Sequence, residues 1–460
     1  MDAATHNIRF MPRSRKGALA RLGDAMQRNR RVILAIQWVI VVFYAVLVVV
    51  PAFLPLPQTG ATILSSLTLF AQFAFWGIWW PFVILSVMLM GRVWCGVFCP
   101  EGALAEFASR HGRGGSIPKW LRWSGWPVLA FILTTIYGQL ISVYDYPQAA
   151  LLILGGSTVA AVAVGWLYGK GKRVWCRYLC PVSGVFALLA RLTPVHFRID
   201  RESWDRYPGR TGAVDCAPLL DVKHLKGASQ CHACGRCSGY RDAVQLAARS
   251  PNAEILADKQ HASTAEAMLL IFGLLGVAIG AFQWSASPWF IQIKQRSAEW
   301  LVEREIFWPL DESPAWWLLT RYAEANDVFT WLDGAAILAY IGAVALVLGG
   351  AVFALTSISA RLARIDWRSL AMGMTPLAGI GLFLGLSMMT LNHLRAEGIL
   401  LPWLPWARGI LLGSGILWSL YLGFNLLRDA SPLRQVVAFV FYAAAAAIIG
   451  IIWSIQFYVW

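Results

Sequence analysis

Long apolar runs separated by shorter polar segments dominate the chain of 460 residues. A helix needs about 20 apolar residues to cross a hydrocarbon core of about 30 Å, and nine runs approach or exceed that length. The predicted spans are 32–54, 62–90, 123–144, 150–168, 265–284, 334–357, 370–391, 408–427 and 433–457. The pattern therefore predicts an all-α integral membrane protein with its two termini on opposite sides of the membrane.

The composition and the charge distribution extend this prediction. The chain is 58% hydrophobic, 14% charged and carries 24 Trp, which is outside the range of soluble proteins. Of the 39 Lys and Arg residues, 33 fall on the side of the N-terminus and 6 on the other side. Basic residues concentrate in cytoplasmic segments. We therefore predict a multi-pass protein of the bacterial inner membrane with a cytoplasmic N-terminus and a periplasmic C-terminus. The net charge of +14 is a topology signal, and the partner it indicates is the lipid bilayer, not nucleic acid.

The spans and polar segments divide the chain into four regions. The first, 1–31, is a basic cytoplasmic tail that can lie on an anionic leaflet and is not expected to be cleaved. Region 32–181 is a four-helix membrane unit, and 182–264 is a polar, cysteine-rich, ferredoxin-like cytoplasmic segment. Region 265–460 is a five-helix membrane block with an outer loop at 285–333. Two helix-like pieces are predicted in that loop, starting at Ser287-Pro288 and Ser313-Pro314.

A nine-residue motif occurs twice in the first membrane unit. RVWCGVFCP at 92–100 is followed 81 residues later by RVWCRYLCP at 173–181, and each copy closes a pair of predicted spans. Such a duplication predicts a pseudo-twofold four-helix bundle with the two boxes face to face at the cytoplasmic surface.

The eight cysteines provide the candidate chemistry. Four lie in the two boxes, and four lie in the polar segment, three of them in QCHACGRC. A disulfide framework is not expected, because all eight fall on the predicted cytoplasmic side, where thiols stay reduced. The triplet C-x₂-C-x₂-C matches the first three ligands of a bacterial ferredoxin run, and C-x₃-C-P matches its end. Structural zinc is the alternative, with His232 or Cys216 as a fourth ligand of the triplet.

With these boxes and the CHACGRC triplet, residues 30–245 resemble the NapH/NosR/CcoG-type membrane polyferredoxin family, and NapH-type quinol-dehydrogenase subunits in particular. The resemblance implies two [4Fe-4S] clusters and electron transfer tied to the quinone pool. Two departures stand out: no fourth cysteine follows Cys237, so Cys216 is expected to complete that set, and residues 261–460 lie outside the resemblance.

The cysteines can be paired with clusters in two ways. The twofold pattern predicts one cluster on the boxes and one on the polar segment, with the ligand sets Cys95, Cys99, Cys176 and Cys180, and Cys216, Cys231, Cys234 and Cys237. In two-cluster ferredoxins, however, the cysteine before proline ligates the other cluster, so Cys99 or Cys180 could complete the set of the triplet. The neighbouring arginines can offset the negative charge of cysteine-ligated clusters; they are Arg92, Arg173, Arg177 and Arg236.

Haem is excluded as an intramembrane partner of these clusters. Only His393 lies at a predicted span, and no CxxCH sequence exists. A quinol site needs groups that accept protons, and ionisable residues at membrane depth are functional candidates by default. The candidates are Tyr137, Gln139, Tyr144 and Asp145 at the outer end of span three, and Asn392, His393 and Glu397 at the outer end of span seven. A site beside the clusters, lined by Trp94, Trp175 and Glu101, is the alternative.

The leading hypothesis is a membrane iron–sulfur protein that exchanges electrons between quinone or quinol and a redox partner. It would act as a quinol-dehydrogenase or electron-transfer subunit beside other redox proteins in a respiratory-chain complex. A second hypothesis is an assembly, maturation or metal-reducing factor of the CcoG type. A third is a membrane scaffold or transporter with structural zinc.

Overall fold

The computed structural model describes residues 17–58, 60–257 and 262–460, and helices dominate it. Within these ranges, eight helical segments are long and apolar enough to cross a membrane. They are Arg30–Phe53 (α2, Arg30–Val49, with a final turn), Leu67–Met90 (α3, Leu67–Gln72; η2, Phe73–Trp79; α4, Trp80–Met90), Pro147–Tyr168 (α7, Pro147–Ala150; η5, Leu151–Gly155; α8, Gly156–Tyr168), Thr264–Gln283 (α13, Thr264–Met268; η8, Leu269–Ala278; α14, Ile279–Gln283), α16 (Trp331–Ala363), α18 (Thr375–Ala396), α19 (Leu404–Leu426) and α20 (Pro432–Tyr458). The predicted all-α membrane protein is confirmed.

One of the nine predicted spans is shorter than expected. In place of 123–144 the structure has α6, Trp126–Leu140, whose 15 residues fall below the roughly 20 needed to span the hydrocarbon core. Ser142 ends this helix, because its φ of 49° is left-handed and turns the chain toward α7.

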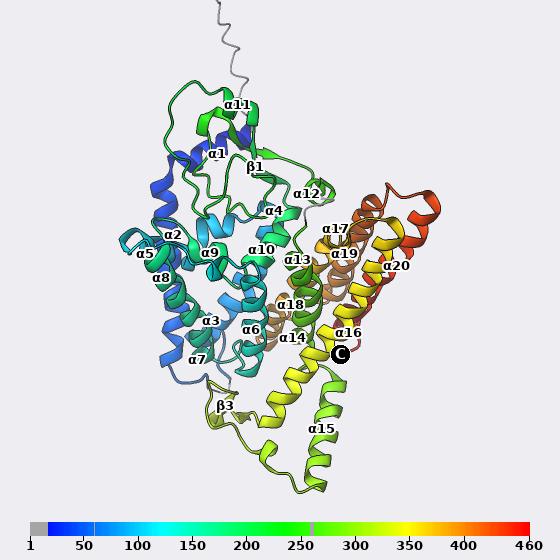
Figure 1. Ribbon diagram of the computed structural model, residues 1–460. Helices are drawn as coiled ribbons and strands as arrows, with labels where there is room; N and C mark the ends of the chain where they lie inside the picture. The colour runs from blue at the N-terminus through cyan, green and yellow to red at the C-terminus, as the bar shows by residue number, and fades with distance from the viewer. Residues whose placement is uncertain (1–16, 59, 258–261) are drawn as a thin grey trace, which may run out of the picture.

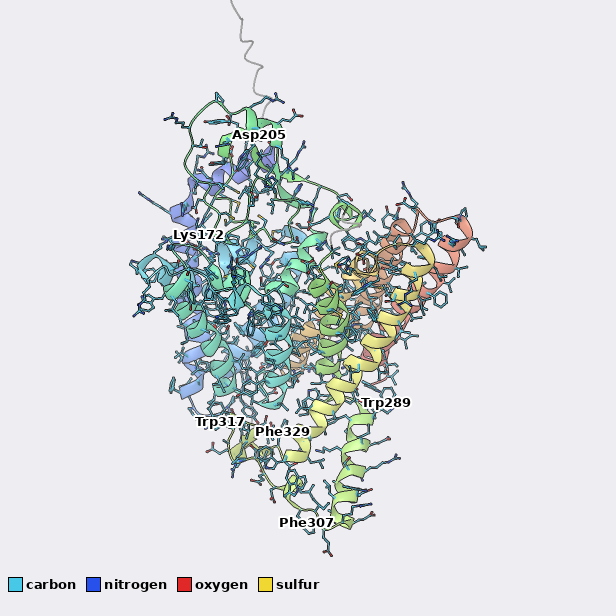
Figure 2. All side chains as sticks on the ribbon, viewed as in Figure 1. Lys172, Asp205, Trp289, Phe307, Trp317 and Phe329 are labelled. Atoms are coloured by element: carbon cyan, nitrogen blue, oxygen red, sulfur yellow. The ribbon has the colours of Figure 1, made fainter. Side chains whose placement is uncertain are left out.

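The segments between the helices gather at the two ends of the bundle (Figure 1). One end, here called the cysteine end, carries α1 (Ala18–Arg28), α11 (Arg201–Arg206), α12 (Ala253–Ala257) and an antiparallel pair of strands, β1 (Val195–Ile199) and β2 (Val244–Ala248). The opposite end carries α15 (Pro288–Glu303) and the hairpin of β3 (Arg321–Tyr322) and β4 (Asp327–Val328). Lys172 and Asp205 lie toward the cysteine end, whereas Trp317 and Phe329 lie at the opposite end (Figure 2).

The described part of the basic N-terminal tail packs against protein. A Cβ at Gly23 of α1 would lie 2.9 Å from Ser238 Oγ and 3.1 Å from Leu246 Cβ. Asp24 also accepts a hydrogen bond of 2.9 Å from the Ser238 hydroxyl. This stretch therefore covers the β1–β2 pair, and the remainder of the predicted tail, 1–16, lies outside the described residues.

The outer loop confirms one of its two predicted helices. The Ser287 hydroxyl caps α15 by accepting from Phe290 N, with Pro288 at the first helical position. The prediction of a second helix from Ser313 is wrong, since that stretch forms turns and the β3–β4 hairpin. Thr320 donates its backbone N–H to Leu140 O at the end of α6, so a tertiary hydrogen bond replaces the helical one.

The polar segment also starts later than the predicted residue 182. Helix α10, Ser183–Leu189, is apolar and buries Val185, Phe186 and Leu188 in the main core. Beyond it, α18 packs on α4 and η2 of the first unit and also on α19, while η8 packs on α6 and α16. These two helices join the first unit to the C-terminal block, which also contains the short helix α17 (Trp367–Met372).

Candidate metal centres and the adjoining cavity

The Cys-Pro end of the first box starts a helix. Cys99 is the N-cap of α5, Pro100–His111, and its sulfur accepts from Gly102 N at 3.4 Å. Proline is favoured at the first helical position, because its missing N–H would have no partner there. Cys95 lies one turn earlier in the π-helical turn η3, Trp94–Phe98. The motif thus holds both thiols at the beginning of α5.

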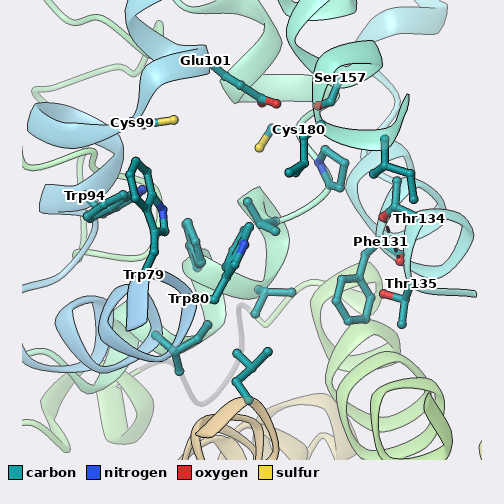
Figure 3. Close-up of a pocket in the computed structure, with 18 of the residues that line it drawn as sticks. Trp79, Trp80, Trp94, Cys99, Glu101, Phe131, Thr134, Thr135, Ser157 and Cys180 are labelled. Carbon is teal, nitrogen blue, oxygen red and sulfur yellow. Dashed lines mark hydrogen bonds between the residues drawn. The ribbon is translucent and has the colours of Figure 1, made fainter. Parts of the chain in front are cut away.

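The four box cysteines line one cavity of about 240 Å³. In the second box, Cys176 belongs to α9, Val174–Tyr178, and Cys180 follows it; Cys99 and Cys180 both point into the cavity (Figure 3). Burial raises the pKa of the Cys176 thiol to about 12, although Arg173 opposes the shift. We call these four thiols the first thiol group.

The other four cysteines form a second thiol group at the cysteine end. Cys216, Cys231 and Cys237 pack against a small core of the β1–β2 pair and α11. Backbone N–H groups point at the sulfurs, with Ala233 N 3.4 Å from Cys231 Sγ. Burial raises the pKa of the Cys237 thiol, and the neighbouring charges of Cys231, Cys234 and Cys216 raise it further.

The two thiol groups adjoin at Gly96 of the first box. A Cβ on this residue would lie 2.1 Å from His232 O and 2.9 Å from Cys234 N. Only glycine allows the two segments to approach this closely. The backbone between Cys95 and Val97 therefore lies directly against the triplet of the second group.

A buried ion-pair network surrounds this junction. Arg173 is fully buried, donates from Nη1 to Cys95 O, and contacts Glu106 through Nε at 2.9 Å. Arg236 and Arg110 donate to the same carboxylate, at 2.6 and 2.5 Å. Burial alone would raise the pKa of Glu106, but Arg173 and Arg236 overcome it and hold the pKa at about 2. Glu106 is thus a carboxylate that keeps two buried arginines beside the thiols.

The arrangement of the ligating side chains favours a cluster over a single metal ion. Among the described residues, no three Cys, His, Asp or Glu side chains stand close enough to share one ion. The sulfurs of a tetrahedral zinc site lie about 3.8 Å apart, because each Zn–S bond is about 2.3 Å. Each cysteine of a [4Fe-4S] cluster binds a different iron, so its sulfurs stand farther apart. Arg92 Nε and Arg173 Nη2 are buried without protein partners and are suitable donors to cluster sulfides. The thiol groups fit clusters better than zinc.

The cavity extends from the first thiol group into the membrane-spanning helices. Its walls are mainly apolar and aromatic, and three of the spans around it contain π-helical stretches, which are frequent at functional sites. Trp79, Trp80 and Trp94 lie on one side, and Phe131 and two threonines on the other (Figure 3). The C-terminal block closes it with Ala278, Ala281, Phe282, Leu382 and Leu386.

A few polar groups face this apolar space. Besides the cysteines and the tryptophans, the side chains with polar groups in the lining are Tyr44, Arg92, Thr134, Thr135, Tyr144, Ser157 and Glu101. The Glu101 carboxyl accepts a hydrogen bond of 3.1 Å from Trp175 Nε1. Burial raises the pKa of Glu101, opposed by hydrogen bonds from Ser157 and Trp175. An apolar pocket with a small number of placed polar groups is typical of a small-molecule site.

Of the residues predicted at the outer ends of spans three and seven, only Tyr144 lines the cavity; the others do not, namely Tyr137, Gln139, Asp145, Asn392, His393 and Glu397. Tyr137 donates to Trp317 O, and Gln139 accepts from Trp284 Nε1 at 2.7 Å. Glu397 accepts from Ile63 N at 2.6 Å. Asp145 accepts from Gln72 through its backbone carbonyl, and the ring of His393 lies edge-on to Phe73. The structure brings these residues into packing contacts and leaves them apart from the thiols, whereas Trp94 and Glu101 of the alternative site line the cavity.

Sequence reasoning missed several cavity residues and the junction. Thr134, Thr135 and Ser157 are polar residues inside predicted apolar spans, and that contrast was a usable signal. Glu106 follows the first box by only a few residues, yet its partner Arg236 lies 130 residues away, so spacing could not reveal the contact.

Comparison with known proteins identifies the class of the duplicated unit. A "4Fe-4S binding domain" model matches the chain twice, at 72–118 and at 151–200, so each box belongs to one copy of an iron–sulfur domain. With its membrane helices, the chain combines the features of a multi-pass membrane protein with two copies of an iron–sulfur binding domain. The resemblance to the NapH/NosR family of membrane electron-transport proteins is confirmed.

The relatives match only in part. The regulatory protein NosR of Pseudomonas aeruginosa is 30% identical over 182 residues, which are 35% of this chain and 25% of NosR. YccM of Escherichia coli, named for electron transport, is 26% identical over 145 residues, or 26% of this chain and 40% of YccM. NosR of Stutzerimonas stutzeri is 27% identical over 133 residues, 25% of this chain and 18% of that protein. The chain thus spans less than half the length of these relatives. No solved structure matches the chain.

Proposed function

We propose that this protein exchanges electrons between membrane quinone and a redox protein docked at the cysteine end. The observation that carries the proposal is the cavity that joins the first thiol group to the interior of the membrane helices. Two [4Fe-4S] clusters, one on each thiol group, would supply one-electron transfer between the quinone and the partner. The partner would be another subunit of a respiratory complex.

The cavity residues have the chemistry that a quinone headgroup requires. Trp79, Trp80 and Trp94 offer flat apolar surfaces for the ring, and the apolar walls keep water away from it. The Thr135 hydroxyl and the Glu101 carboxyl offer hydrogen bonds to ring oxygens. The C-terminal block would then serve to close the cavity, which gives a role to helices beyond the duplicated unit.

The contact at Gly96 supports transfer between the two thiol groups. The second group lies nearer the polar surface: its four cysteines are all half-buried, whereas Cys95 and Cys176 of the first group are buried. An electron path would therefore run from the cavity through the first group to the second group. The bias of Lys and Arg supports placing the cysteine end at the cytoplasmic face of the bacterial inner membrane.

Reduction of the purified protein by a short-chain quinol tests this proposal. Thr135→Val removes a cavity hydroxyl without changing shape and is expected to raise the KM for quinol up to about tenfold, the value of one hydrogen bond. Thr356→Val is the matched control, because Thr356 is buried in α16 away from the cavity. Iron-loaded protein that a quinol does not reduce would refute the quinone assignment and favour an assembly or metal-reducing role. Equal KM values in both variants would refute the site.

A further inference from the structure

A second cavity, of about 230 Å³, lies on the other side of the second box. Its walls come from the start of α6, from α9 and α10, from the triplet loop, and from the start of the Thr264–Gln283 span. These are the ends of membrane helices on the cysteine side, so the cavity lies where lipid headgroups meet protein. We call it the arginine pocket.

The charges of the arginine pocket are predominantly positive. Arg92, Arg122 and Arg177 line it, and the described lining contains one carboxylate, Glu266. Arg191 pairs with that carboxylate at 2.8 Å and so offsets its charge. Arg177 donates a hydrogen bond of 2.9 Å to the neutral side chain of Gln230. The pocket therefore favours an anion.

A buried polar side chain faces the same space. His232 is 2% exposed and lines the pocket, and among the described residues its Nδ1 has no hydrogen-bond partner. Buried polar groups without partners are rare and require an explanation, which an unseen ligand supplies. The serines Ser124 and Ser183 add hydroxyls to the lining.

The mouth of the pocket has the character of a membrane interface. Trp123 is 54% exposed and packs edge-on against Trp126, whose ring also lies edge-on to Trp120. Such aromatic groups are typical of the headgroup level. Below them, Leu129 and Leu133 are exposed on α6 and offer an apolar track for an acyl chain.

We infer that the arginine pocket binds the phosphate group of an anionic phospholipid. The guanidinium groups of Arg122 and Arg177 and the His232 ring would hold the phosphate, and α6 would hold an acyl chain. Basic pockets between membrane helices on the cytoplasmic side are suited to anionic headgroups. The pocket shares Arg92 and Cys176 with the wall of the proposed quinone cavity but opens on the other side of the second box, and its occupancy does not depend on the quinone assignment.

Native mass spectrometry of the full chain in mild detergent tests the inference, with phosphatidylglycerol and phosphatidylcholine added in equal amounts. Wild-type protein is expected to retain phosphatidylglycerol preferentially. Arg122→Gln, at an exposed position outside the thiol groups, should lower its occupancy about fivefold, the equivalent of about 1 kcal/mol per basic residue. Arg122→Lys should restore much of it.

Arg113→Gln is the matched control, because this substitution removes the same charge as Arg122→Gln at a position outside the pocket. Arg113 lies over the Trp166 ring. Equal losses in both Gln variants, or equal retention of the two lipids by wild type, would overturn the inference. Inorganic phosphate that binds with the same dependence on Arg122, without retention of phosphatidylglycerol, would assign the pocket to a free anion and overturn the lipid assignment. Iron content measured in parallel must be equal in all variants, so that a loss of clusters cannot imitate a loss of lipid.

Discussion

The first box, at 92–100, and the second, at 173–181, share their Arg-Val-Trp-Cys opening and their Cys-Pro end, but they have different neighbours. Gly96 of the first box lies against the triplet of the second thiol group. Its equivalent, Arg177, faces the arginine pocket and reaches Gln230. One copy of the motif therefore joins the two thiol groups, while the other borders a second cavity.

The residues after each box differ in the same sense. Glu101 and Glu106 follow the first box, whereas Val182 and Ala187 occupy the equivalent positions after the second. Glu101 faces the aromatic cavity, and Glu106 holds Arg173 of the second box against Cys95 of the first. Duplication thus provides the two pairs of thiols, and the differences between the copies provide the charges that hold them together.

The largest effect is expected from the carboxylate that connects the copies. Glu106→Gln removes the carboxylate that pairs with the buried Arg173 and leaves Arg236 with only the longer contact of 4.0 Å to Asp215 among the described residues. Removing one member of a buried ion pair costs about 3–5 kcal/mol. The thermal unfolding temperature in detergent should fall steeply, and iron should be lost on purification. Ala187→Ser, at the equivalent position after the second box, serves as the control. A variant with wild-type stability would show that the network does not hold the junction.

The same carboxylate predicts a dependence of stability on pH. The pKa of Glu106 is about 2 in the folded protein and 4.5 ordinarily, so the unfolded chain binds the proton more readily. The stabilisation is fully present above about pH 4.5 and is lost as the pH falls through 4.5 toward 2. Between pH 4.5 and 2, the free energy of unfolding of the wild type should fall more steeply with decreasing pH than that of Glu106→Gln. Parallel curves for the two proteins would contradict the assignment.

A smaller loss of stability is expected from a substitution at Gly96, where the second box has Arg177. Gly96→Ala places a methyl group 2.1 Å from His232 O, and such overpacking costs about 1–3 kcal/mol. Arg177→Ala, at the equivalent position, should change stability by less than about 1 kcal/mol, because Arg177 is only partly buried. Chemical or thermal unfolding of both variants measures the difference. Equal destabilisation by Gly96→Ala and Arg177→Ala would contradict the claim that only the first box is packed tightly against the triplet.

Much of this organisation could be predicted from sequence, because it is local. The apolar runs set the membrane helices, and the repeated C-x₃-C-P and C-x₂-C-x₂-C spacings indicate iron–sulfur ligation. The end of α6 was misplaced because Ser142 adopts a left-handed turn inside an apolar run. The stretch after Ser313 was misread as a helix because its hydrogen bonds are made to α6 and to its own hairpin.

The junction and the cavity are not local. Gly96 gives no sign in the sequence that a loop 136 residues later will press on its backbone. The cavity combines residues from helices of both membrane blocks. The periodicity within one helix does not reveal which residues of a distant helix it will contact. Polar residues at the ends of spans three and seven attracted the prediction of a quinol site, but such residues also serve as ordinary packing contacts, as Gln139 and Glu397 show.

The central claim is that the eight cysteines form two separate four-iron sites, with the boxes holding one and the polar segment the other. Iron counted in purified Cys180→Ser and Cys237→Ser, with electron paramagnetic resonance of the reduced proteins, tests it most directly. The account predicts about eight irons in wild type and about four in each variant, with a different cluster signal surviving in each. Zinc in place of iron, or the same surviving signal in both variants, would contradict it.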